Sequence, residues 1–236
     1  MGYITQPTTS SSDMGIQMRN RFGIAVRQSA MAIVGLALAG VVAAAPITIV
    51  NFSFEDPAFA DGGFNSGPVT GWVVTGGSGV FNPTVGQLSQ GPTDGLQVGY
   101  SNNIGLALQQ DLLAVVTGNT VYTLRVDLQS RTDGFPHVST TLELRTVADD
   151  LLASATFGAV PSGTNQLLTA TFFASAGDPN LGENLRINLI AGGQQSDWDN
   201  VRLDATLRTP TGVPEPGTLF LLGAALAGLG VMRRKF

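Results

Sequence analysis

The chain has 236 residues, a formal net charge of −5, 43% hydrophobic residues and no cysteine. The lack of cysteine excludes disulfides and thiol catalysis, and the single histidine, His137, excludes an ordinary zinc centre. Residues 45–208 hold 15 acidic residues against six arginines and no lysine, which argues against binding to nucleic acid or to an anionic membrane surface.

Residues 1–44 have the layout of a secretory signal peptide with an extended n-region. Three arginines precede an apolar run at residues 30–45 that ends in small residues. We predict cleavage after Ala44, because cleavage one residue later would place Pro46 beside the scissile bond. This predicts the Sec translocon and signal peptidase as partners, and an uncleaved N-terminal membrane anchor is the alternative.

Residues 45–208 are long enough for one folded domain, and their pattern predicts an all-β fold. Gly and Pro recur about every eight to twelve residues, and apolar and polar residues alternate between them. This favours two packed antiparallel sheets of about ten strands. The clearest strands are 122–129, 138–145, 185–190 and 201–207, with further strands at 47–54, 71–75, 95–100, 104–110, 152–157 and 166–173.

Residues 209–216 form a linker that ends in the triplet Pro214, Glu215 and Pro216. Residues 217–236 follow as an uncharged apolar stretch and a basic end that includes Arg233 and Arg234. A stretch of about sixteen apolar residues reaches about 24 Å as a helix, which is short of the roughly 30 Å hydrocarbon core. The stretch therefore suits a transient transmembrane helix, and a C-terminal core helix of a soluble domain is the alternative.

The triplet, the apolar stretch and the basic end together resemble the PEP-CTERM sorting signal of Gram-negative bacteria. The resemblance implies exosortase as a processing partner and an intermediate in the inner membrane, held there by the C-terminal helix. It also implies delivery to the cell surface or extracellular matrix and an association with exopolysaccharide and biofilm. Removal or retention of the helix stays open.

The domain itself resembles the galactose-binding-like jelly rolls, which include carbohydrate-binding modules. The resemblance rests on NFSFEDP at 51–57, GW at 71–72, DGLQVGY at 94–100, YTLRVDLQSR at 122–131 and DWDNVRL at 197–203. It implies a structural Ca²⁺ that joins the first and last strands, with Glu55 and Asp199 as ligands and Asp56 as a further one. Hard oxygen ligands in an acidic domain suit this ion.

Two residues of the last strand are placed by alternation alone. Asp199 is in phase with Val201 and Leu203, so its carboxylate is predicted to point toward the core, where it needs a metal or a polar partner. The alternative is that Asp199 caps a turn or pairs with an arginine. Trp198 has the opposite phase and is predicted to face solvent, where it and Tyr100 are the candidate residues for stacking on a sugar.

No catalytic residue is predicted. His137 has no convincing partner for a Ser–His–Asp arrangement, and no nucleophile-elbow motif occurs. The sequence therefore favours a non-catalytic surface or matrix protein that binds polysaccharide. A glycan-acting extracellular hydrolase and a purely structural surface protein or adhesin are the alternatives.

Overall fold

The computed structural model describes residues 44–208, 217 and 221–226, and residues 221–226 are helical. The predicted signal peptide, sorting triplet and basic end lie outside these residues. Within the described part of the chain, no helix combines the length and the apolar character needed to cross a membrane. The strands are β1 (Ala45–Ile47), β2 (Val73–Val74), β3 (Ser78–Phe81), β4 (Val98–Ser101), β5 (Gly105–Val115), β6 (Thr120–Gln129), β7 (Thr140–Thr146), β8 (Leu151–Phe157), β9 (Asn165–Ala174), β10 (Asn184–Ala191) and β11 (Ser196–Leu207).

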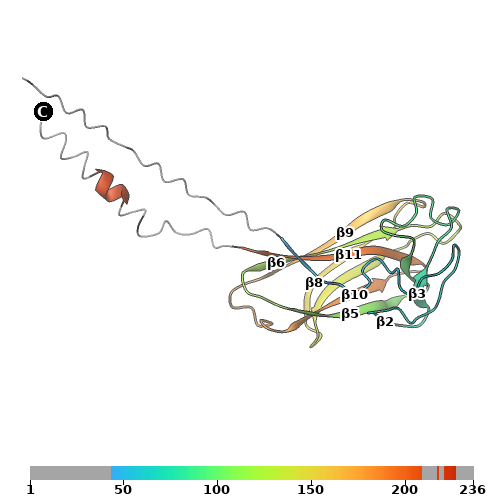
Figure 1. Cartoon of the computed structure of the whole chain (residues 1–236), viewed down its shortest axis with the longest axis horizontal. Helices are drawn as coiled ribbons and strands as arrows, with labels where there is room; N and C mark the ends of the chain where they lie inside the picture. The colour runs from blue at the N-terminus through green and yellow to red at the C-terminus, as the bar shows by residue number, and fades with distance from the viewer. Residues whose placement is uncertain (1–43, 209–216, 218–220, 227–236) are drawn as a thin grey trace, which may run out of the picture. The chain divides into compact units, whose positions relative to one another are not determined.

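These strands form two antiparallel sheets, which confirms the predicted sandwich. The larger sheet has the order β3-β4-β11-β6-β9, with β1 also paired to β11. The smaller sheet has the order β2-β5-β10-β7-β8. Figure 1 shows β6, β9 and β11 in one layer and β2, β5 and β10 in the other. Strand β11 is the centre of the larger sheet, because β6 pairs along one side of it and β4 and β1 share the other.

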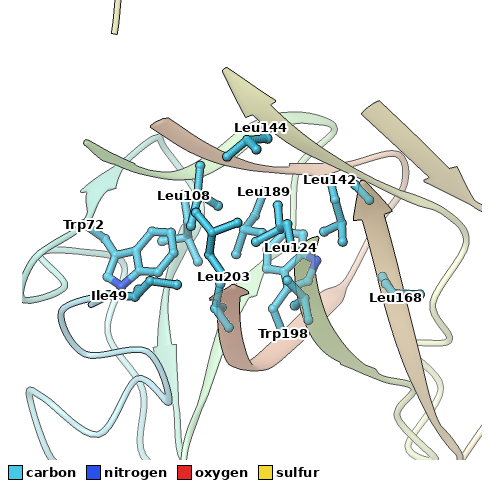
Figure 2. Packing of buried hydrophobic residues seen from close by; sticks show 14 of the residues in the cluster. Ile49, Trp72, Leu108, Leu124, Leu142, Leu144, Leu168, Leu189, Trp198 and Leu203 are labelled. Atoms are coloured by element: carbon cyan, nitrogen blue, oxygen red, sulfur yellow. The ribbon is translucent and has the colours of Figure 1, made fainter. Parts of the chain in front are cut away.

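The core lies between the two sheets and is built by the alternation seen in the sequence. Leu124 and Leu128 of β6 face Leu142 and Leu189 of the other sheet, and all four side chains are fully buried. Trp198 packs among them, as Figure 2 shows beside Leu124 and Leu203. The residues that alternate with these leucines on β6 face outward and are half-buried, as expected for a sandwich strand.

The structure departs from the predicted strands at the N-terminal end of the domain. Of the predicted strand 47–54 only Ile47 lies in a strand, at the end of β1, because the chain turns back after Ile49. Asn51 and Phe54 adopt positive φ angles of 50° and 59°, which a continuous strand does not allow. Strand β3 was not predicted, because its sequence SGVF follows directly on a glycine pair that indicates only a turn.

A bulge in β11 changes which face each of its residues occupies. Asp199 lies opposite Asp127 and Arg202 opposite Arg125, so that one more residue stands on β11 than on β6 between these pairs. Asn200 takes a positive φ of 50° at this point. The bulge places the side chain of Asp199 on the outer face of the sheet, although that of Val201 faces the core.

Candidate functional site

The outer face of the larger sheet carries a second apolar cluster at the end where β11 begins. Tyr100 lies opposite Asp197 in the β4–β11 pair, whereas Gly99 lies opposite the core residue Trp198. Tyr100 therefore faces away from the core, and it packs with Phe81, Leu88 and Val98 in a cluster separate from the main one.

A pocket of about 450 Å³ lies at this cluster. Tyr100 contacts Phe64 and Phe81 edge-to-face, with ring centroids 6.3 Å apart in both pairs. The Tyr100 hydroxyl donates to the carbonyl of Asn65 at 2.8 Å, which fixes the ring. Phe135, which is 41% exposed, completes the aromatic part of the lining. Flat apolar molecules fit such walls best.

The polar part of the lining comes from Arg131 and from side-chain amides. The guanidinium carbon of Arg131 lies 4.8 Å from the ring centroid of Phe81 and 5.1 Å from that of Phe135. Asp133 holds the same guanidinium through two side-chain hydrogen bonds, and this lowers the pKa of Asp133. The carboxylate of Asp133 thus balances the charge of Arg131, and the plane of the guanidinium is fixed between two aromatic rings.

Asp197 lies beside this pocket, between Tyr100 on β4 and Gln129 on β6. It is 1% exposed, and burial raises the pKa of its carboxyl to about 7. Oδ1 accepts a hydrogen bond from Nε2 of Gln195 at 2.6 Å, but Oδ2 has no partner among the described residues. Burial of the carboxyl favours its protonated form.

Gln129 and His137 extend this buried polar group. Three of their polar atoms also have no hydrogen-bond partner among the described residues: Oε1 and Nε2 of Gln129 and Nε2 of His137. Burial lowers the pKa of His137 to about 4, against a hydrogen bond to the backbone of Gln195 that raises it. The imidazole is therefore neutral at physiological pH.

The predicted metal ligands lie elsewhere, around the loop at residues 93–97. Oδ2 of Asp199 accepts hydrogen bonds from the backbone N–H of Thr93 at 2.7 Å, from its hydroxyl at 2.9 Å and from the N–H of Asp94 at 2.8 Å. Oε1 of Glu55 accepts from the N–H groups of Leu96 and Gln97, both at 2.8 Å. The two carboxylates thus hold the two halves of one loop.

The prediction that Asp199 points into the core is wrong, because the bulge turns it to the outer face. It is nevertheless fully buried, since the loop covers it. Burial raises the pKa of Asp199 to about 7, and the hydrogen bonds from Asp94, Thr93 and Asn200 oppose this rise. The capping alternative describes this geometry better than the arginine alternative, because Arg202 pairs with Asp127.

Calcium binding here stays a prediction. Asp56 is exposed and its N–H is held by Asn51, and the described residues contain no group of three or more acidic or histidine side chains suited to a metal. One oxygen of each carboxylate already accepts two or more hydrogen bonds from the loop, so a cation would have to use the other oxygen of Glu55 and of Asp199 together with backbone carbonyls. The donors are chemically suitable for Ca²⁺, but the loop as it stands presents few of them.

The calcium prediction can be checked by thermal unfolding of the purified protein in Ca²⁺ and in chelator. A bound ion at a hundredfold excess over Kd adds about 2.7 kcal/mol to the free energy of unfolding, so the midpoint should rise in Ca²⁺. The rise should be largely lost in Asp199→Asn. An equal midpoint in both buffers for the wild-type protein would show that the carboxylates hold the loop without a metal.

The two predicted sugar-stacking residues have different positions. Trp198 is fully buried and its indole Nε1 donates to Oγ1 of Thr140 at 3.0 Å, so the prediction that it faces solvent is wrong. The reason is the bulge: because it adds a residue between Asp199 and Arg202, the alternation counted from Val201 assigns the residues before the bulge to the wrong face. Tyr100, by contrast, lies in the pocket wall.

Sequence reasoning did not single out Asp197, Gln195, Arg131 or Phe135. The only sequence signal was the DWD triplet, in which two acids flank a tryptophan on the predicted last strand. The partners of Asp197 come from loops distant in sequence, so no spacing rule could bring them together.

The fold and pocket define a jelly-roll sandwich with a ligand-sized cavity on the outer face of one sheet and a buried acid at its side. The chain belongs to the HpiC1-like family, described as HpiC1 cyclase, whose model matches residues 45–204. A second model, the PEP-CTERM protein-sorting motif, matches residues 212–235. No curated protein matches the sequence at a significant level.

Solved structures of cyclases match the same domain. The Stig cyclase Fisc from Fischerella sp. TAU, in complex with (3Z)-3-(1-methyl-2-pyrrolidinylidene)-3H-indole, is 28% identical with a TM-score of 0.62 and covers 70% of this chain and 100% of its own. A cyclase from the same organism, in complex with 4-(1H-indol-3-yl)butan-2-one, has the same identity, TM-score and coverage. The CBM22-1 xylan-binding domain from Paenibacillus barcinonensis is 17% identical over 59% of this chain and 88% of its own, with a TM-score of 0.41.

These matches decide three expectations from the sequence. The expectation that the protein is not an enzyme is contradicted, because the family model and the similar structures are those of cyclases. The resemblance to PEP-CTERM proteins is confirmed, so the chain is an exported, exosortase-sorted surface protein. Carbohydrate-binding modules are indeed among the structural neighbours, but a likeness this weak says nothing about the ligand.

Proposed function

We propose that the domain is a surface-exported cyclase that acts on a small aromatic substrate, with Asp197 as the proton donor. One observation carries the proposal: a buried carboxyl with an unpartnered oxygen lies beside a pocket walled by Phe64, Phe81, Tyr100 and Phe135. Membership of a cyclase family supports the catalytic reading.

The lining supports an indole or a ring of similar size as the substrate class. The pocket volume of about 450 Å³ suits a small bicyclic molecule, and its aromatic rings offer edges and faces for stacking. The two cyclase structures from Fischerella sp. TAU hold indole-containing ligands, which agrees with this chemistry. The guanidinium of Arg131, whose charge is balanced by Asp133, adds a flat, weakly hydrated surface for the same ring.

The chemical step follows from the protonated acid. Oδ2 of Asp197 gives its proton to a carbon of the electron-rich ring, which breaks the O–H bond, forms a C–H bond and leaves a carboxylate and a cationic ring. The cation is electrophilic, so a nucleophilic carbon or heteroatom of the same molecule can close a new ring onto it. Loss of a proton to the carboxylate then restores the acid. A positioned general acid contributes about 10² to 10⁴ in rate.

Deuterium uptake into indole tests the acid without knowledge of the natural substrate. In D2O, transfer of a deuteron from Asp197 to carbon 3 and return of the original proton to the carboxylate give 3-deuterioindole, which ¹H NMR measures directly. We expect the wild-type protein to accelerate this exchange above the buffer rate, and 4-(1H-indol-3-yl)butan-2-one to inhibit it by occupying the pocket. An exchange rate equal to that of buffer, with no binding of the ketone, would overturn the proposal.

Polysaccharide binding, expected from the sequence, is the alternative function, and it would be favoured if indole exchange and ketone binding were both absent. A glycan array would then identify the ligand. The lining alone would also suit a sugar, because five side-chain amides stand beside the four aromatic rings, and membership of a cyclase family is what favours the smaller aromatic substrate.

We further propose that the mature surface form lacks both ends of the chain. The sorting motif supports passage through an inner-membrane intermediate before exosortase cuts near the triplet at 214–216. Intact-mass analysis of the protein from the native host should show an N-terminus near Ala45 and loss of the segment after the triplet. Recovery of the full-length chain from the outer surface would contradict this.

A further inference from the structure

The turn that joins β10 to β11 is fixed more tightly than a connecting turn requires. The N–H of Gly192 donates to the carbonyl of Ser139 at 2.9 Å. A Cβ atom on Gly192 would lie 1.9 Å from Oγ of Ser139, and one on Gly193 would lie 2.5 Å from Cβ of Val138. Only glycine allows this approach, so the turn is pressed against the segment that precedes β7.

Gln195, the last residue of this turn, is held in an unfavourable conformation. Its φ is +60°, in the left-handed region that a glutamine rarely adopts, and its side chain is 2% exposed. A turn on the surface would place glycine or asparagine here. Backbone strain of this kind costs about 1–3 kcal/mol and is found mainly where a side chain must be held for function.

The buried amide of Gln195 has one polar target. Its Nε2 donates to Oδ1 of Asp197 at 2.6 Å, and Oδ2 of the same carboxyl has no partner among the described residues. Two donors of the pocket have other partners and do not compete for the carboxyl of Asp197. The guanidinium of Arg131 donates to Asp133, and the Tyr100 hydroxyl donates to the carbonyl of Asn65. The two oxygens of the carboxyl are therefore made unequal by one side chain.

We propose that Gln195 is a positioning residue for the acid, which holds Oδ1 of Asp197 as the acceptor and so leaves the proton on Oδ2. This rests on the proposed function, because it assigns a role in the same proton transfer. The carbonyl oxygen of a protonated carboxyl is a better acceptor than its hydroxyl oxygen, so an N–H donor at Oδ1 favours the proton on Oδ2. The strained turn fixes the amide and thereby the rotation of the carboxyl group.

Two substitutions separate this role from that of the backbone. Gln195→Gly and Gln195→Asn both suit a positive φ better than glutamine, and both remove the reach of the amide. Asn119→Gly is the matched control, because Asn119 also has a positive φ, of 56°, but lies in the turn between β5 and β6. A purely structural role predicts equal or higher thermal stability and no loss of exchange in both Gln195 variants.

The positioning role predicts a different pattern in the indole exchange assay. Saturating rates should fall about tenfold in both Gln195 variants, as expected for loss of one hydrogen bond to the reacting group, and this fall should exceed any change in the half-saturating indole concentration that comes from the place of Gln195 in the pocket lining. The Asn119→Gly protein should keep the wild-type rate. Unchanged saturating rates in the Gln195 variants would overturn the proposal.

A spectroscopic readout decides the proposal independently of activity. The side-chain NH2 resonances of Gln195, assigned by their loss in Gln195→Gly, should shift when Asp197→Asn replaces the carboxyl that they contact. If the wild-type protein shows no exchange but these resonances shift, the proposed function fails and the contact stands. If they do not shift, Gln195 does not hold Asp197 and the inference is wrong.

Discussion

Asp197→Asn is expected to lower the rate of deuterium uptake into indole by at least about a hundredfold, the usual contribution of a general acid. The amide has nearly the same shape and can still accept from Nε2 of Gln195, so the turn and pocket should stay intact. It has no acidic proton to transfer, however. Binding of 4-(1H-indol-3-yl)butan-2-one should therefore survive while exchange is lost.

Asp150→Asn is the matched control for this prediction. Asp150 is an exposed acid in the turn between β7 and β8, and its carboxylate has no hydrogen bond among the described residues. The control should keep the wild-type exchange rate within about twofold, since surface substitutions of this kind change stability by no more than about 0.5 kcal/mol. Retained exchange in Asp197→Asn would remove this residue from the role of proton donor.

Trp198→Ala should be the most destabilising single substitution in the domain. The side chain is fully buried between the sheets, and its removal from a packed core costs about 3–5 kcal/mol. For a domain of this size the midpoint of thermal unfolding should fall by roughly 6 to 20 °C. Trp198→Phe should cost less, because most of the apolar contact stays and only the hydrogen bond to Thr140 is lost.

The same experiment separates the two orientations of this strand. A solvent-facing tryptophan, as alternation from Val201 predicts, could be truncated at a cost below about 0.5 kcal/mol. A small shift in midpoint for Trp198→Ala, measured on the purified protein, would therefore contradict the buried position and the bulge that produces it.

The sandwich was predictable because its main strands obey a period of two over seven or more residues. Tyr122, Leu124, Val126 and Leu128 alternate with polar residues, and all four are buried in the structure. Local alternation of this kind depends on neighbours within one strand, so it can be read without knowledge of the partner strands. A short element such as β3 depends on pairing instead, and its sequence carries little signal.

The candidate site was less predictable because it is assembled from loops. Phe64 precedes β2, Arg131 and Phe135 follow β6, and Gln195 precedes β11, so their proximity depends on strand order. Tyr100 could be suspected because an aromatic residue near a turn is a common ligand contact. The burial that gives Asp197 its chemistry depends on the loops above it, which no local pattern encodes.

The bulge at Asn200 makes the length of β11 as informative as its composition. Deletion of this one residue would exchange the two faces of the strand's first half, so that Asp197 and Asp199 would enter the sandwich and Trp198 would leave it. A relative that lacks this residue must therefore be aligned with its gap at Asn200. Otherwise a core tryptophan would be matched to Asp197, the residue that we propose as the acid.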